Sequence, residues 1–81
     1  MNQMIKPAMD VQVIDLVLHP CAYHDALIAA VRQGQQDSEA IDHLVALLPV
    51  AIAQLDAVGD TYGALALDGL YDRLIQLEAM V

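Results

Sequence analysis

The sequence is poor in cysteine, in basic side chains and in long apolar runs. Its 81 residues include one cysteine, Cys21, so an internal disulfide is excluded, which fits a reducing compartment. The chain has three basic residues, Lys6, Arg32 and Arg73, and eleven acidic residues, so its net charge is −8. Nucleic acids and anionic membrane surfaces both require a cationic face. Neither is therefore an expected partner.

The sequence also shows no pattern typical of a signal peptide or of a membrane-spanning helix. The longest uncharged apolar run is Leu44 to Ala53, ten residues, whereas a bilayer-spanning helix needs about 20. Residues 1–7 contain one lysine and no apolar core of signal-peptide length, so we expect them to form a loose leader. The sequence thus predicts a cytoplasmic protein whose residues 1–81 form a single domain.

Apolar residues, in contrast, are abundant. They make up 58% of the chain, against about 45–50% in typical globular proteins on a count that includes glycine. A domain this short buries only roughly 60% of its unfolded surface, and small domains are usually stabilised by disulfides, a metal or a partner chain. The surplus apolar surface predicts a homo-oligomer, most simply a dimer, or a protein partner.

Hydrophobic spacing predicts an all-α fold, a small bundle of three to four helices. The segment 9–18 contains β-branched residues that would also suit a strand, but the chain offers no second strand to pair with it. We therefore expect a short helix there, capped by Asp10. Pro20 is suited to the first position of a second helix that runs to residue 33, and Gly34 is suited to its end.

The last two predicted helices form a long antiparallel hairpin. Asp37 or Ser38 caps the first of them, whose apolar phase continues unchanged through Pro49. Pro49 either kinks or ends this helix, and the unbroken phase favours a kink. Gly59 ends the helix and Asp60 caps the next, predicted over 61–80. Its heptad seam consists of Gly63, Leu67, Leu70, Leu74, Leu77 and Val81.

Two consequences of the hairpin concern its contacts. The interior glycines Gly63 and Gly69 are expected where another backbone comes close. The leucine seam is expected to pack on the preceding helix, leaving an apolar surface for a second chain. The predicted interface residues are Tyr62, Leu65, Tyr71 and Ile75.

The predicted function is therefore recognition. We expect a small acidic protein–protein interaction, adaptor or regulatory module, without catalysis and without a cofactor. An acidic inhibitor that binds a basic surface, as a DNA mimic does, is an alternative interpretation.

Polar side chains gather near the start of the second predicted helix. His19, Cys21 and His24, joined by His43 from a neighbouring helix, are of the types that bind zinc. Their spacing matches no standard zinc motif, and no bound metal is predicted. Cys21 at a helix start with His24 one turn away would suit a nucleophile and its base. Asp25 is expected to point elsewhere, leaving no orienting third group, so no catalysis is predicted.

Two short stretches resemble known families. Residues 55–65, Leu-Asp-Ala-Val-Gly-Asp-Thr-Tyr-Gly-Ala-Leu, resemble the turn of a tetratricopeptide repeat, although no second copy occurs at a period of about 34 residues. Asp37-Ser38 and the apolar phase after it resemble the second helix of acyl carrier proteins, which implies a phosphopantetheine arm on Ser38. The chain departs from the carrier pattern at Glu39, at Gln35-Gln36, and in the helix predicted over 20–33.

Overall fold

The computed structural model describes residues 6–34 and 38–79. Over these residues it contains a short 3₁₀ helix and four α-helices, with no strand, so the all-α prediction is confirmed. In chain order they are η1 (Ala8–Asp10), α1 (Val13–Leu18), α2 (Pro20–Arg32), α3 (Ser38–Ala57) and α4 (Thr61–Ala79). Most of the predicted leader, residues 1–5, lies outside the described residues.

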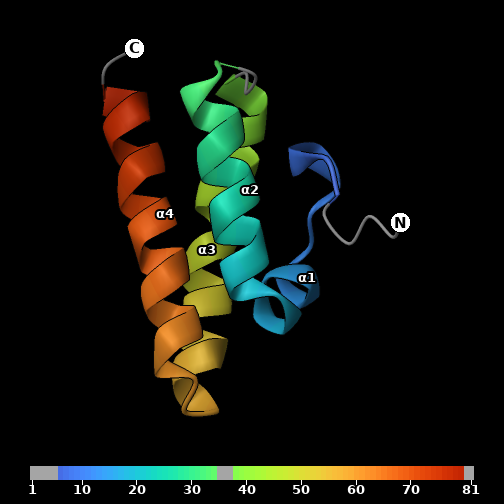
Figure 1. The fold of residues 1–81 in the computed structure, drawn as a ribbon, viewed down its shortest axis with the longest axis vertical. Coiled ribbons are helices and arrows are strands. Elements are labelled where there is room, and N and C mark those ends of the chain that lie inside the picture. The colour runs from blue at the N-terminus through green and yellow to red at the C-terminus, as the bar shows by residue number, and fades with distance from the viewer. Residues whose placement is uncertain (1–5, 35–37, 80–81) are drawn as a thin grey trace.

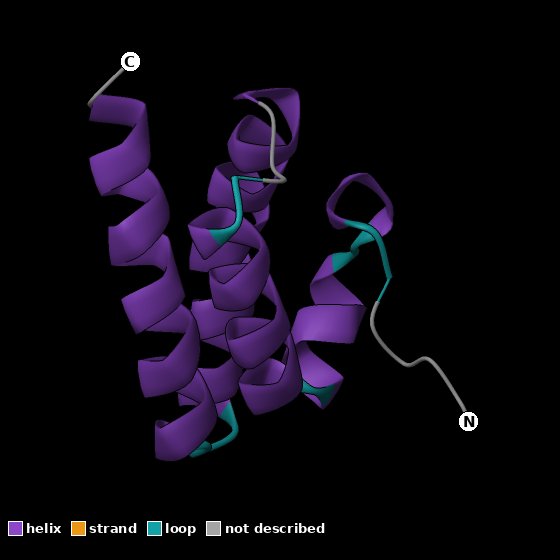
Figure 2. Cartoon of the chain, turned by 45° about the horizontal axis from the view of Figure 1, so that its top comes forward, coloured by secondary structure: helices purple, strands orange, loops and turns teal. Residues whose placement is uncertain are grey.

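The helices form a small bundle around the α3–α4 hairpin. α2 and α4 run in one direction and α3 runs in the other (Figures 1 and 2). α4 packs on both α3 and α2, while α1 packs on α3 and α2, and η1 packs on α3. The N-terminal elements and α2 therefore cover one side of the hairpin.

The core is built mainly from leucine. Three seam residues of α4, Leu67, Leu70 and Leu74, are fully buried, and Leu77 packs partly buried against them. The predicted seam is therefore confirmed over the described residues, and Val81 lies outside them. The other buried apolar residues are Ala8, Val11, Leu16, Tyr23, Leu27, Ala40, Leu44, Leu48, Ala51, Leu55 and Ala64.

The helix α3 continues without a break through Pro49, so the alternative in which a helix ends there is wrong. Pro49 is exposed, and its ring removes one backbone donor from the helix. By length and hydropathy alone, α3 is the one described helix that would be able to cross a membrane. Its leucines Leu44, Leu48 and Leu55 are, however, buried in the core.

The start of α1 differs from the prediction. Asp10 ends η1 and caps no α-helix; the cap of α1 is Gln12. The Gln12 N–H donates to the Asp15 carboxylate at 2.8 Å, and Asp15 also pairs with Lys6 at 3.2 Å. The backbone is extended at Val11 and Gln12, because Val11 is drawn into the core. A helix beginning at residue 9 is incompatible with that extended link.

Candidate functional site

The turn between α3 and α4 is held by backbone hydrogen bonds. Gly59 has a φ of 80°, which favours glycine. The Asp60 N–H donates to the Leu55 carbonyl at 2.9 Å, and the Gly59 N–H donates to the backbone carbonyl of Asp56 at 3.1 Å. These two bonds form a Schellman motif. The Asp60 carboxylate accepts from the Gly63 N–H at 2.9 Å and caps α4. The predicted roles of Gly59 as the residue that ends α3 and of Asp60 as the cap of α4 are both confirmed.

Of Gly63 and Gly69, the two glycines predicted to allow close packing, only Gly63 is closely packed. A Cβ on Gly63 would lie 2.8 Å from Cγ of Pro20 and 2.7 Å from Oδ2 of Asp60. The close neighbours are thus side chains, from α2 and from the cap, and not another backbone. The prediction for Gly69 is wrong, because a Cβ there would meet nothing within 4 Å.

Two further heptad-spaced rows lie on the sides of α3 and α4 that are turned away from the buried leucines. The α3 row consists of Ser38, Asp42, Val45, Pro49, Ile52 and Asp56, and the α4 row consists of Thr61, Leu65, Asp68, Asp72, Ile75 and Ala79. In both rows the spacing alternates between four and three residues, so each row follows one side of its helix. We call the strip between the two rows the outer groove.

The outer groove lies on the side of the hairpin that α1 and α2 leave uncovered. On α3, His43 contacts the N-terminal segment. The side chain of Val45, two residues later, points about 160° away from that of His43 around the helix axis. On α4, Gly63 faces Pro20 of α2, and Leu65 likewise leaves about 160° away. Both rows therefore point away from the elements that cover the hairpin.

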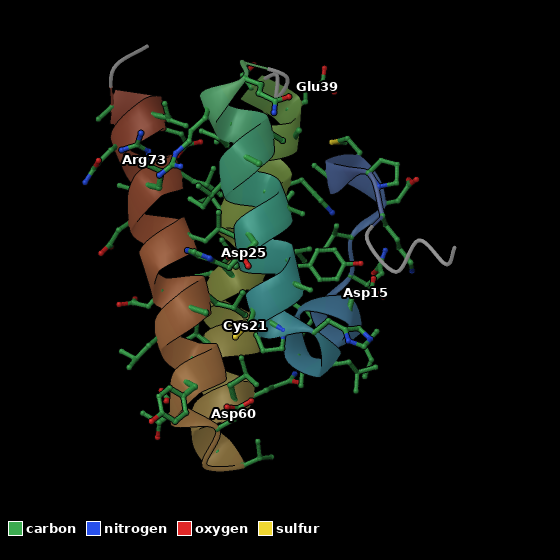
Figure 3. The ribbon with its side chains drawn as sticks, viewed as in Figure 1. Asp15, Cys21, Asp25, Glu39, Asp60 and Arg73 are labelled. Carbon is green, nitrogen blue, oxygen red and sulfur yellow. The ribbon has the colours of Figure 1, made fainter. Side chains whose placement is uncertain are left out.

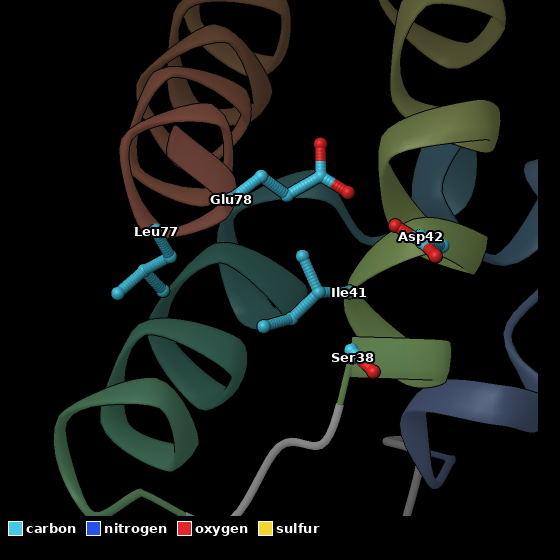
Figure 4. Close-up of a pocket in the computed structure, with 5 residues that line it drawn as sticks. All are labelled: Ser38, Ile41, Asp42, Leu77 and Glu78. Carbon is cyan, nitrogen blue, oxygen red and sulfur yellow. The ribbon is translucent and has the colours of Figure 1, made fainter. Parts of the chain in front are cut away.

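A cavity of about 280 Å³ shows that the two rows border a common space. It is lined by Ile52 and Asp56 from the α3 row, by Thr61, Leu65 and Asp68 from the α4 row, and by Ala64. A cavity of about 340 Å³ lies at the other end of the hairpin, between Ser38, Ile41 and Asp42 of α3 and Leu77 and Glu78 of α4 (Figure 4). The α3 row contributes to both cavities and so runs from one to the other.

The outer groove is apolar with acidic borders. Leu65 is 62% exposed and Ile75 is 38% exposed, while Val45 and Ile52 are half-buried between them and the core. The exposed charged residues of the rows are Asp42, Asp56, Asp68 and Asp72. No basic residue occurs in either row.

The three basic side chains of the chain lie elsewhere. Lys6 pairs with Asp15 beside α1, and Arg32 lies in the last turn of α2. Arg73 lies far along α4 from Asp60 (Figure 3). It leaves the helix about 160° from the row residue Ile75, two positions later. The carboxylates of the groove are therefore not matched by a cation from the same chain.

At the 340 Å³ cavity two carboxyl groups from different helices interact. The pKa of Glu78 is raised above its ordinary 4.5 by a hydrogen bond with Asp42, by partial burial and by the charge of Asp42. The folded state consequently binds a proton at this place more tightly than the unfolded chain does. The repulsion between these groups at neutral pH is a cost of bringing the end of α4 to the start of α3.

We expect Glu78→Gln to remove part of the pH dependence of stability. Because the folded pKa is raised, stability falls as pH rises from about 4.5 through the raised value, and the penalty persists at neutral pH. The variant should therefore be more stable than the parent at pH 7 and should lose this slope. Urea unfolding between pH 4 and pH 7, at roughly half-unit steps, measures both effects. Asp72→Asn, an equal charge change on exposed α4 surface, should keep the slope, and an unchanged slope in Glu78→Gln would contradict the assignment.

The structure separates the four predicted interface residues. Leu65 and Ile75 lie in the α4 row, and Tyr71 is half-buried against the core. Tyr62 is 84% exposed, but it is nine residues from Tyr71 and so lies on the opposite side of α4. Leu65 and Ile75 therefore lie toward one side of α4, and Tyr62 lies outside the groove.

The four zinc candidates do not assemble. Nε2 of His43 lies 2.8 Å from the Val11 carbonyl, so this nitrogen carries the proton and donates, which is a structural role. Nδ1 of His24 lies 3.0 Å from the Asp25 carboxylate, and Cys21 is exposed on the same helix (Figure 3). The expectation that Asp25 points away from His24 is thus wrong. Within the described residues no three histidine, cysteine or acidic side chains are placed to hold a metal.

The Ser38 hydroxyl is placed where a modification is sterically open. Ser38 is exposed, begins α3 and lines the 340 Å³ cavity with Ile41 and Leu77 (Figure 4). The preceding Asp37 lies outside the described residues, so its predicted capping role has no structural account here. The helix predicted where carrier proteins have a loop is present as α2. The phosphopantetheine arm stays a prediction from the resemblance.

Comparison of the chain with known family models, with curated proteins and with solved structures gave no match.

Proposed function

We propose that this chain is a small protein–protein interaction module of the cytoplasm, which binds a partner protein through the outer groove and carries out no catalysis. The observation that carries the proposal is the pair of exposed apolar side chains in the α4 row, Leu65, which lines the 280 Å³ cavity, and Ile75. Exposed apolar side chains beside a concave, acid-bordered surface are typical of recognition sites. The exposed free thiol of Cys21 fits a reducing compartment.

The hydrogen bonds and packing of the hairpin also support recognition. The Schellman turn at Gly59 and the Asp60 cap hold α3 and α4 in one arrangement. The seam leucines that join the two helices are fully buried. A preorganised surface loses little conformational entropy when it binds, so more of the contact energy appears as affinity. The same partner would cover apolar surface that this short chain leaves in water.

Photo-crosslinking in the host cell tests the proposal with a matched pair of positions. The photoreactive residue p-benzoylphenylalanine replaces Leu65 in the groove or Leu18 on α1, which are 62% and 63% exposed. We expect a discrete protein adduct from position 65 and not from position 18. Adducts from position 18 alone, or none from either position, would contradict the proposal.

The mass of the adduct distinguishes the alternatives. A product of twice the chain mass assigns the groove to self-association, the predicted homodimer. The intact mass of the unirradiated protein tests the alternative that Ser38 carries a phosphopantetheine arm. A mass increase of the size of phosphopantetheine that disappears in Ser38→Ala would assign the arm to Ser38.

A further inference from the structure

We infer that the occupant of the outer groove is an amphipathic helix of a partner protein, with basic side chains near both of its ends. The inference rests on the proposed function and names the class of partner that the same surface takes. It is carried by the shape of the two rows, by the placement of the carboxylates at the two ends of the groove, and by the absence of cations in both rows.

The geometry of the rows favours a helix as the occupant. Each row repeats at four and three residues along its helix, so the apolar ridge of a third helix, which has the same repeat, matches the spacing of both rows. Leu65 and Ile75 present exposed apolar contacts from α4, and the half-buried Ile52 presents an apolar contact from α3. The backbone of the hairpin is helical over Ser38–Ala57 and Thr61–Ala79, so these two segments offer no open edge to an added strand.

The charges favour a basic occupant and place its cations. One acidic pair, Asp56 and Asp68, lines the 280 Å³ cavity, and the other, Asp42 and Glu78, lines the 340 Å³ cavity. Asp42 and Asp56 are fourteen residues apart in α3, which is about 21 Å along the helix. A partner helix that places lysine or arginine about four turns apart meets both pairs, and at one of them it offsets the repulsion between Asp42 and Glu78.

A second copy of this chain is the less suitable occupant. Two copies that met through the same surface would bring Asp56 and Asp68 of one against the carboxylates of the other, because a twofold interface is self-complementary. Neither row contains a basic residue to offset this repulsion. Arg73 leaves α4 on the opposite side from Ile75 and is not positioned to supply the cation.

The probe for the test is a synthetic amphipathic peptide of leucine and lysine, about 18 residues long and thus about five helical turns. Its leucines follow the four-and-three spacing, and lysines lie at both ends. Fluorescence anisotropy of the labelled peptide measures affinity, and circular dichroism measures helix gained on binding. A peptide with glutamate in place of lysine is the charge control.

Two double variants of equal charge separate the groove from general attraction to an acidic protein. Asp56→Asn with Asp68→Asn removes one acidic pair of the groove. Asp10→Asn with Asp25→Asn removes two exposed carboxylates outside both rows. We expect about a tenfold weakening for the groove variant, the combined effect of two partly exposed charge pairs, and little change for the other. Ile75→Gln should weaken binding as well, because it removes an apolar contact.

Equal weakening by the two double variants would overturn the inference, and so would equal binding of the glutamate peptide or binding without helix formation. A dimer in sedimentation of the protein alone that Ile75→Gln abolishes would also overturn it, while leaving the proposed function in place with a second copy as occupant. Failure of the proposed function itself would be seen separately, as the absence of a crosslinked adduct from position 65 in the host cell.

Discussion

Replacing Leu70 by aspartate is expected to abolish the cooperative unfolding transition. Leu70 is fully buried in the seam of α4, where an ionised carboxylate would have neither water nor a partner charge. Truncation to alanine alone costs about 2–5 kcal/mol at such a site, and a core of this size supplies only about 3–5 kcal/mol in total. Thermal circular dichroism of Leu70→Asp should therefore show a sloping signal without a sigmoidal transition.

The matched control is Leu65→Asp, five residues earlier on the same helix. Leu65 is 62% exposed and borders the outer groove, so the new carboxylate stays in water. We expect the variant to fold, with a melting temperature within about 5 °C of the parent, since surface substitutions usually change stability by less than about 0.5 kcal/mol. Loss of folding in both variants would show that the α4 row is part of the core and that the groove assignment is wrong.

The two interior glycines of α4 are expected to respond to alanine with opposite signs. At Gly63 the added Cβ would meet Pro20 and the capping carboxylate of Asp60 below 3.0 Å. Overpacking of this kind costs about 1–3 kcal/mol, which exceeds the gain of about 1 kcal/mol in helix propensity. At Gly69 the Cβ would be unobstructed, so only the gain of about 1 kcal/mol remains.

Urea unfolding of Gly63→Ala and Gly69→Ala measures this difference directly, because both variants add the same methyl group to the same helix. The midpoint should fall for Gly63→Ala and rise for Gly69→Ala. A rise for both variants would mean that α2 yields at Pro20 without cost, and that the start of α2 is not tightly fitted against α4.

Under the proposed function, the acidic borders of the groove favour binding of a cationic partner at a cost in stability. A hydrogen bond with Asp42, partial burial and the charge of Asp42 raise the pKa of Glu78 where α3 and α4 meet, and the ionised pair costs stability at neutral pH. Local rules of stability are commonly violated at functional sites. A cationic partner that binds only the folded chain would remove the repulsion and raise the apparent stability by mass action.

Much of the helical framework follows from local sequence rules. Gly59 at the end of α3 and Asp60 at the start of α4 have the predicted roles, because a left-handed glycine and a capping carboxylate act within one turn of the chain. The start of α2 at Pro20 and the leucine seam of α4 are likewise as predicted. These features depend on residues close in sequence, so periodicity and capping preferences are sufficient to find them.

The candidate site was predictable only in part. Leu65 and Ile75 belong to the groove as the sequence suggests, whereas Tyr62 lies outside it. The four-and-three spacing of Asp42, Val45, Pro49, Ile52 and Asp56 was a signal available in the sequence. The stronger apolar phase of the same helix masks it, because a row that mixes acidic and apolar residues reads as an ordinary solvated face.

Composition, capping residues and apolar spacing by themselves determined that this chain is acidic, helical and ends in a long antiparallel hairpin, since these properties depend on neighbours within a few turns. Only the tertiary structure decided which side of the hairpin stays uncovered. The hydrogen bond from His43 to Val11 and the contact of Gly63 with Pro20 seat the N-terminal elements and α2 on one side. Those contacts join residues more than thirty positions apart, a distance over which helical periodicity carries no information about packing.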